Sequence, residues 1–280
     1  MRYIAVIGDD EWEKYSPGRS DLLMLARVDL ANSLVTLVTI PRDTAYTWED
    51  GSKIKVNMAY ERGGAEAACK AVSTIAGVPV TDYVTVGFDG LQSIVGYFNG
   101  IEVDVPYDFS YSFYTKDFPD EEYTAGVQTL DPWRVMAISR ARTGYPQYGF
   151  LGDVIRQAVD RQMLTTMLDL VLSAEDPAGT AEALLPFVET NIAKEDALGM
   201  ITQLSQADEV TVYGTTGPVN GDTDAESGLW LTTYYPDRWE KLMQVVDLGG
   251  DPSTVNVQDE GFSDSPEAPI NTKTVLTPQK

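Results

Sequence analysis

The chain has 280 residues, 43% of them hydrophobic, so it can bury the core of one large domain or two small ones. Its formal net charge of −23 argues against nucleic acid as a partner, because binding phosphate backbones needs a basic face. Histidine is absent, which excludes imidazole catalysis and His-ligated zinc, and the single cysteine, Cys69, excludes an intramolecular disulfide.

The charge is spread unevenly along the chain. Fifteen of the 20 Lys and Arg residues lie in residues 1–161, so an anionic ligand is expected to bind there. The alternative is an acidic protein whose few cations are ordinary surface residues. No run of 18 or more apolar residues occurs and no signal peptide opens the chain, so we expect the chain as it stands to be soluble.

Hydrophobic periodicity predicts strands and helices that alternate along the first half of the chain. In order these are a strand at Tyr3–Ile7, a hairpin of Asp21–Asp29 and Leu34–Ile40, a helix over Gly64–Ala76 ending at Gly77, a strand at Asp82–Phe88, a helix over Gly90–Phe98 capped by Asp89, and a strand at Ile101–Val105. Residues 107–125 lack periodicity and are predicted to be a surface loop.

The second half is predicted to be mostly helical. Its elements are a helix beginning at Asp131-Pro132, a loop at Thr143–Gly149, helices at Val154–Ser173, Ala178–Phe187 and Glu195–Leu204, a strand at Val210–Tyr213 and a helix at Asp237–Val246. The fold class predicted is α/β, with one α-β-α domain over residues 1–250 and a mixed central sheet covered by helices on both faces. Residues 251–280 are polar and contain proline, so we expect a disordered tail there.

Carboxylates lie where two of the predicted strands begin or end. Asp9 and Asp10 follow the first strand, and Asp21 opens the second. Mg²⁺ takes one or two carboxylates and completes its shell with water and phosphate oxygens, so Asp10 and Asp21 are candidate ligands. The alternative is that they are turn residues and charges at strand edges.

Cations and a carboxylate follow the third strand. Arg42 and Asp43 lie at its carboxyl end, where α/β folds commonly bind ligands, and the planar guanidinium of Arg42 suits two phosphate oxygens. Lys55 and Asn57 share one face if this stretch is extended, and Arg62 precedes Gly63-Gly64, whose backbone could approach an anion. The alternatives are a loop ion pair and a solvated basic strand.

More candidate residues surround the loop at Thr143–Gly149. Arg140 and Arg142 end one helix, and Asp153, Arg156 and Gln157 open the next. Residues two apart do not share a helical face, so both arginines reach one ligand only if the chain leaves the helix there. The alternative is that these are charges on helix surfaces.

Together these motifs resemble the LytR-CpsA-Psr family. The family's elements occur here in order, as Gly8/Asp10, Ser20/Asp21, Pro41–Thr44, Lys55/Asn57/Ala59/Tyr60, Gly63/Gly64, Arg140/Arg142 and the residues around 153–157. The resemblance covers residues 2–172, and residues 173–250 look like the C-terminal extension of many members. The last motif fits in two frames, one aligned on Asp153 and one on Arg156-Gln157, and neither is complete.

The resemblance implies a Mg²⁺-dependent phosphotransferase. Its donor would be a polyprenyl-pyrophosphate-linked glycan, such as a teichoic acid or capsule precursor, and its acceptor peptidoglycan. The catalytic residues implied are Arg42, Asp43, Arg140, Arg142, Asp153 and Arg156, the substrate-binding residues Lys55, Asn57, Arg62 and Gln157, and the metal ligands Asp10 and Asp21. The lipid would enter a channel walled by Gly64–Ala76, Gly90–Phe98 and Val154–Ser173.

The resemblance also implies a membrane anchor N-terminal to this chain, and a place on the outer face of the cell membrane or in the cell wall of a Gram-positive-type bacterium. Two other readings stay open. One is a non-catalytic relative that binds polyprenyl phosphate or cell-wall glycan, and the other is an unrelated α/β module for protein interaction.

Overall fold

The computed structural model describes residues 1–10, 18–112, 120–142, 151–259 and 269–279. Among these residues, seven strands form one mixed sheet in the order β11-β6-β1-β2-β3-β12-β15. The strands are β1 (Arg2–Asp9), β2 (Ser20–Asp29), β3 (Leu34–Thr39), β6 (Asp82–Val86), β11 (Glu189–Thr190), β12 (Val210–Thr216) and β15 (Thr272–Leu276).

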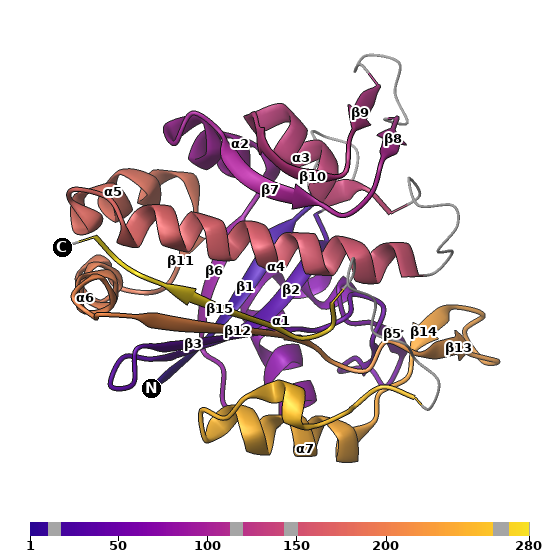
Figure 1. Ribbon diagram of the computed structural model, residues 1–280. Coiled ribbons are helices and arrows are strands. Elements are labelled where there is room, and N and C mark those ends of the chain that lie inside the picture. The colour runs from indigo at the N-terminus through magenta and orange to yellow at the C-terminus, as the bar shows by residue number, and fades with distance from the viewer. Residues whose placement is uncertain (11–17, 113–119, 143–150, 260–268, 280) are drawn as a thin grey trace.

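Helices cover both faces of this sheet, as Figure 1 shows. Alternation along β1 sends Tyr3, Ala5 and Ile7 to one face, where they pack with α1 (Met58–Ala76) and α7 (Pro236–Asp247). Ile4 lies on the other face, in a second core with α4 (Leu151–Leu172) and α6 (Lys194–Ser205). The predicted α/β class with a covered mixed sheet is confirmed.

A further layer lies on the far side of α4. It contains α2 (Phe88–Tyr97), α3 (Pro132–Arg140) and the pair β7 (Ile101–Val105) and β10 (Gly126–Leu130). Ile155, Val159 and Met163 of α4 pack into this layer, while Leu164, Leu168 and Leu172 pack on the sheet. Two apolar faces therefore hold α4 between the layers. The remaining helix, α5 (Pro177–Leu184), lies beside α6.

Small hairpins extend from the edges of the layers. They pair β4 (Ala45–Thr47) with β5 (Lys53–Lys55), β13 (Gly221–Thr223) with β14 (Trp230–Thr232), and β8 (Phe109–Tyr111) with β9 (Glu121–Tyr123). The prediction of a loop over 107–125 is therefore wrong where the structure describes it. Phe109 and Tyr123 lie opposite each other on β8 and β9 with their rings stacked 4.6 Å apart, because burying aromatic side chains favours cross-strand pairing.

Several predicted boundaries are confirmed. β2 and β3 form the hairpin, Gly77 ends α1 with a φ of 70°, and the side chain of Asp131 caps α3 by accepting a hydrogen bond from the Arg134 amide. Asp89 does not cap α2, because the helix already begins at Phe88 and Asp89 lies in its first turn. The loop predicted at Thr143–Gly149 lies outside the described residues.

The prediction of a disordered tail over residues 251–280 is wrong for the part of it that the structure describes, residues 251–259 and 269–279. Thr272–Leu276 forms β15, which pairs antiparallel with β12 and completes the sheet. Averaging composition over thirty residues hid this short segment, whose β-branched residues favour a strand. None of the described helices combines the length and apolar character needed to span a membrane.

Arg161 of α4 anchors the segment that leads into β15. Its buried guanidinium donates to the Thr39 and Thr216 hydroxyls at the ends of β3 and β12, and to the Pro269 carbonyl at 2.7 Å. Arg161 therefore links α4, the central sheet and the segment that leads into β15.

We expect Arg161→Ala to lower the free energy of unfolding by about 3 kcal/mol, because it leaves buried hydroxyl and carbonyl groups without their donor. Urea unfolding followed by circular dichroism measures this. Lys70→Ala, which removes an exposed ion pair with Glu49, is the control and should leave the midpoint unchanged. Equal midpoints for wild type and Arg161→Ala would contradict the anchoring role.

Candidate active site

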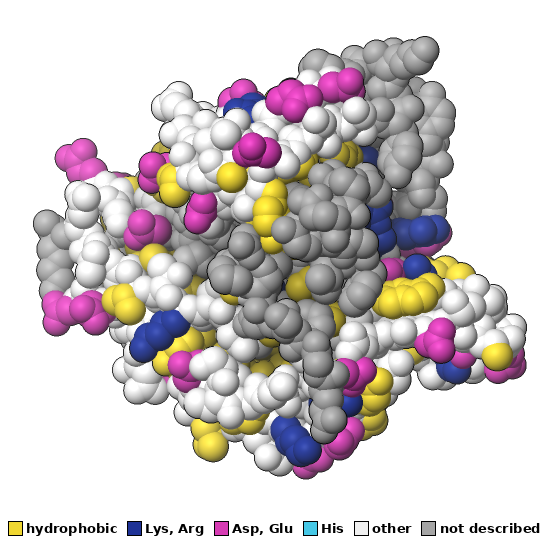
Figure 2. All heavy atoms as spheres, turned by 45° about the vertical axis from the view of Figure 1, so that its right-hand side comes forward, with side chains coloured by type: hydrophobic (Ala, Val, Ile, Leu, Met, Phe, Trp, Pro, Cys, Tyr) yellow, Lys and Arg dark blue, Asp and Glu magenta, His cyan; other side chains and the backbone are white. Residues whose placement is uncertain are grey.

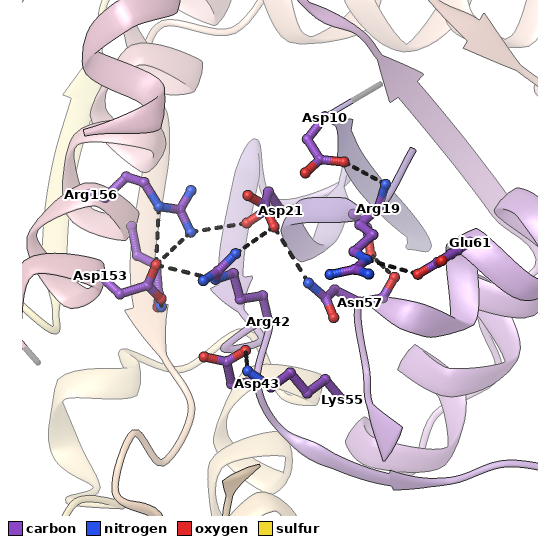
Figure 3. A network of polar contacts seen from close by, with 12 residues as sticks. Asp10, Arg19, Asp21, Arg42, Asp43, Lys55, Asn57, Glu61, Asp153 and Arg156 are labelled. Atoms are coloured by element: carbon purple, nitrogen blue, oxygen red, sulfur yellow. Dashed lines mark hydrogen bonds and ion pairs between the residues drawn. The ribbon is translucent and has the colours of Figure 1, made fainter. Parts of the chain in front are cut away.

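Most of the predicted site residues converge at one end of the central sheet. β2 runs antiparallel to β1 and β3, so its first residues lie beside the last residues of both neighbours. A β-bulge at Gly8/Asp9 redirects the chain as it leaves β1. The N-terminal half of α4 crosses this end, which brings Asp153 and Arg156 to Asp21 and Arg42 (Figure 3).

Asp21 and Arg42 form the centre of a polar network. Arg42 donates from Nη1 to Asp21 Oδ1 at 2.7 Å, and its Nε lies 3.6 Å from Asp153 Oδ1. Asn57 also donates to Asp21 Oδ1, at 3.4 Å. Burial opposes the charge on Arg42, but Asp21, Asp153 and Asp43 outweigh it and raise the pKa of the guanidinium.

Arg156 is buried and makes four contacts with protein oxygens. Its Nη1 donates to Asp160 Oδ2 at 2.7 Å, its Nη2 to the Asp21 carbonyl at 3.0 Å, and both Nε and Nη2 to Asp153 Oδ1. Gln157 donates from Nε2 to Asp153 Oδ2 at 2.7 Å. Asp153, Arg156 and Gln157 therefore act as one unit, whichever frame describes the last motif.

The carboxylates that border Arg156 differ in their pKa. Burial alone would raise the pKa of Asp153, but Arg156 and Arg42 outweigh it and lower that pKa. Asp160 is more deeply buried, and burial raises its pKa to about 7 despite the attraction of Arg156. One carboxylate is thereby held ionised, while the other titrates near neutral pH.

Asp10 lies across from this network. Its Oδ1 accepts a hydrogen bond from the Arg19 amide at 2.6 Å, and its pKa is raised by burial and by the nearby charges of Asp21 and Asp9. Tyr60 donates to Asp9 Oδ2 at 3.1 Å. A divalent cation stabilises carboxylates that lie close together and repel one another, so this wall of the pocket suits such a cation.

Asp10 and Asp21 fit the predicted Mg²⁺ site in the nature of their oxygen donors and in their common pocket. The described residues hold no group of three or more His, Cys, Asp or Glu side chains placed to bind a metal ion. A cation here would therefore complete its shell with water or with phosphate oxygens of a substrate.

Two of the predicted substrate-binding residues lie at different distances from this network. Lys55 lies at its edge, where it pairs with Asp43 at 2.9 Å (Figure 3). Arg62 lies apart from it, because it stacks on Trp48 at 5.4 Å and donates to Ser52 at the β4–β5 turn. Gly63 and Gly64 have non-helical backbone angles that divide α1 into two helical segments, so a helix begins after them, as predicted. Gly64 has a φ of 65°, which favours glycine. Neither glycine is among the residues that line the pocket described next.

A pocket of about 220 Å³ opens beside the network. Its lining combines charged and apolar side chains. The charged ones are Asp9, Asp10, Asp21, Arg140, Arg142, Arg156 and Asp160, and the apolar ones include Leu22, Val86, Phe88, Leu91, Met163, Leu164 and Met167. Along α4 the lining changes from charged at Arg156 and Asp160 to apolar from Met163 to Met167. Such a pocket fits an amphiphile with a charged head and an apolar tail.

Arg140 and Arg142 both line the pocket, as the sequence predicted they could if the helix ended between them. α3 ends at Arg140. The extended backbone of Ala141 lets Arg142 line the same pocket as Arg140. The guanidinium of Arg140 lies over the ring of Phe88 at 4.7 Å. These two cations are therefore placed to meet an anion in the pocket.

The predicted lipid channel is partly correct. Residues of Gly90–Phe98 and Val154–Ser173 do line the pocket, whereas Gly64–Ala76 does not, because α1 covers the opposite face of the sheet. On the face shown in Figure 2, acidic side chains are scattered widely and cations are fewer. The charge of −23 is therefore not concentrated into one patch on this face.

Sequence reasoning missed Asp160 and Phe88. Asp160 lies four residues after Arg156 and seven after Asp153, a spacing that places all three on one helix face and could have revealed it. Phe88 gave no such signal, because its contact with Arg140 joins residues 52 positions apart.

Asp153→Asn should lower the free energy of unfolding by about 2 kcal/mol at pH 7, because it removes the charge that faces Arg156 and Arg42. A pKa lowered in the folded state gives stability that is present above about pH 3.8, the ordinary value, and lost as the pH falls below it. Urea unfolding between pH 7 and pH 3 should show the difference narrowing with acid. Asp169→Asn, farther along α4, is the control, and a difference that did not vary with pH would contradict this account.

Comparison with known proteins identifies relatives of this chain. A sequence model described as the LytR_cpsA_psr family matches residues 2–244. The polyisoprenyl-teichoic acid–peptidoglycan teichoic acid transferase TagV of Bacillus subtilis (strain 168) is 31% identical over 198 residues, which are 69% of this chain and 50% of that protein. TagU of Enterococcus faecalis (strain ATCC 700802 / V583), named as the same kind of transferase, is 32% identical over 63% of this chain and 54% of its own length.

Solved structures share the fold. The crystal structure of B. subtilis TagV superposes with a TM-score of 0.73 at 26% identity, over 89% of this chain and 96% of that one. TagT bound to LIIa-WTA superposes with a TM-score of 0.68 at 16% identity, over 89% of this chain and 90% of that one, which shows a common fold alone. The chain spans about half the length of the two curated relatives described above.

Proposed function

The chain belongs to the LytR_cpsA_psr family, as its motifs predicted, and we propose that it transfers a glycopolymer from a polyprenyl-pyrophosphate carrier to peptidoglycan. The observation that carries the proposal is the pocket, whose lining combines charged with apolar side chains and changes from charged to apolar along α4. A donor of this class has the same division, because a pyrophosphate joins a lipid to a sugar. Relatives named as teichoic acid transferases support teichoic acid as the glycopolymer.

The reaction joins the acceptor to the glycan through one phosphate. A hydroxyl oxygen of peptidoglycan attacks the phosphorus that carries the glycan, the bond from that phosphorus to the bridging oxygen breaks, and polyprenyl phosphate leaves. The acceptor proton passes to a base or to water. Such a transfer depends on positioning and on neutralising the charge of the phosphates.

The arginines divide this work. Arg140 and Arg142 would contact the pyrophosphate, since both line the pocket. Arg42 and Arg156 already pair with Asp21, Asp153 and Asp160, so they hold the geometry of the site and add positive charge at its wall. The lowered pKa of Asp153 suits an orienting carboxylate better than a base.

Asp10 and Asp21 would hold Mg²⁺, which supplies positive charge to the pyrophosphate oxygens when bound. Asp43 pairs with Lys55 and also raises the pKa of Arg42, so it would orient both cations. The family's place in wall assembly supports a location in the cell envelope and a membrane anchor preceding this chain.

The test is release of polyprenyl phosphate from a short synthetic polyprenyl-pyrophosphate glycan, by wild type and Arg142→Ala. Removing a cation that contacts the transferred phosphate should lower the rate by about 100-fold or more. Arg238→Ala on α7, which pairs with Asp259 on the opposite side of the sheet, is the matched control and should retain the wild-type rate. No release by wild type, with tight lipid binding that Arg142→Ala weakens, would instead indicate a binding protein.

The role of the metal is tested in the same assay. EDTA should abolish release and added Mg²⁺ should restore it, and Asp10→Asn should raise the Mg²⁺ concentration needed for half-maximal rate, because it removes one carboxylate ligand. Full activity in EDTA would show that the arginines alone neutralise the pyrophosphate.

A further inference from the structure

Asp160 is a carboxylate in a pocket that otherwise suits an anion. It lines the wall, its side chain is 4% exposed, and its Oδ2 lies 2.7 Å from Nη1 of Arg156. A buried carboxylate costs free energy even when paired, so its presence needs a reason beyond stability.

The position of Asp160 along α4 supplies that reason. Arg156, Asp160, Leu164 and Met167 lie at helical spacing on the face of α4 that lines the pocket. The wall is cationic one turn before Asp160 and apolar one turn after it. Asp160 therefore marks the boundary between the part of the pocket that suits a charged head and the part that suits a lipid tail.

Asp160 also restrains the cation nearest to it. Arg156 directs Nη1 to Asp160, Nη2 to the Asp21 carbonyl and Nε to Asp153, so all three nitrogens are engaged by protein oxygens. Arg140 and Arg142, at the end of α3 and just after it, also line the pocket. An anionic head that moved along α4 toward the apolar residues would be repelled by the charge of Asp160. It would also gain no hydrogen bond from Nη1 of Arg156, which already donates to Asp160.

We propose that Asp160 is a positioning residue that holds Arg156 in place and keeps the anionic head of the substrate at the Arg140 and Arg142 end of the pocket. The proposal rests on the proposed function in that it takes an amphiphile with an anionic head as the ligand. It concerns binding as well as turnover, so the two can be tested apart.

The charged groups around Asp160 determine how this position responds to pH. Those on the same helix or on β2 are Arg156, Arg161, Asp153 and Asp21. Those on other elements that line the pocket are Asp9, Asp10, Arg140 and Arg142. Burial raises the pKa of Asp160 to about 7, so its charge is lost as the pH falls through that range. Losing it removes the repulsion of an anionic head and releases Nη1 of Arg156, and binding of such a head should tighten.

The binding experiment uses farnesyl methyl phosphate, a phosphodiester whose single charge does not change between pH 5 and pH 9, with EDTA present. Wild type should bind this probe more tightly as the pH falls from 8.5 to 6. Asp160→Asn should bind it about five- to tenfold more tightly than wild type at pH 8.5, with little further change toward pH 6. Asp169→Asn, the same substitution farther along α4, should follow wild type.

The kinetic experiment uses the polyprenyl-pyrophosphate glycan. For Asp160→Asn we expect KM to fall together with kcat, because the anionic head of the donor binds more tightly but away from Arg140 and Arg142. A merely structural role would raise KM and lower the unfolding midpoint instead. Asp160→Glu, which restores the charge, should recover the pH dependence of probe binding.

An Asp160→Asn variant that bound the probe no more tightly than wild type, or kept the wild-type pH dependence, would overturn the proposal. If this variant does not fold, wild type alone still decides, because binding of uncharged farnesol should not vary with pH while binding of the phosphodiester does. Absence of any transferase turnover would count against the proposed function but leave the binding results to judge Asp160.

Discussion

The buried guanidinium of Arg156 is the interaction on which the site depends. It donates to the carbonyl of Asp21, the second residue of β2, and so joins α4 to the sheet. It also donates to two carboxylates of its own helix, those of Asp153 and Asp160. Bringing these charges out of water is costly, and the cost is offset only because every nitrogen of the guanidinium meets an oxygen. The arrangement therefore fixes the depth and rotation of α4 against the sheet.

That placement of α4 creates the pocket. The helix is apolar on two faces, one packed on the sheet and one on the layer of α2, α3, β7 and β10, and the pocket lies where those packed surfaces separate. The same helix face carries Arg156 and Asp160 followed by Leu164 and Met167. One element thus supplies both the charged and the apolar part, so their spacing is set by helical geometry rather than by a flexible loop.

The fold and the site were predictable to different degrees. Period-two alternation and buried runs gave β1, β2 and β3 within one or two residues, because a sheet with both faces covered needs those patterns. β15 escaped prediction because an edge strand of five residues carries little hydrophobic signal. Asp89 was misjudged as a cap because helix starts depend on backbone geometry as well as on residue type.

The sequence by itself determined the order of the motifs, and through them the family, since residue types at fixed places along the chain are a linear property. It also identified Asp10, Asp21, Arg42, Arg140, Arg142, Asp153 and Arg156 as candidate site residues, because they belong to those motifs. Only the tertiary structure decided that Arg156 lines the pocket while Asp153 and Asp160 hold its guanidinium. That arrangement depends on contacts such as Arg156 with Asp21, 135 positions apart, which no local pattern encodes.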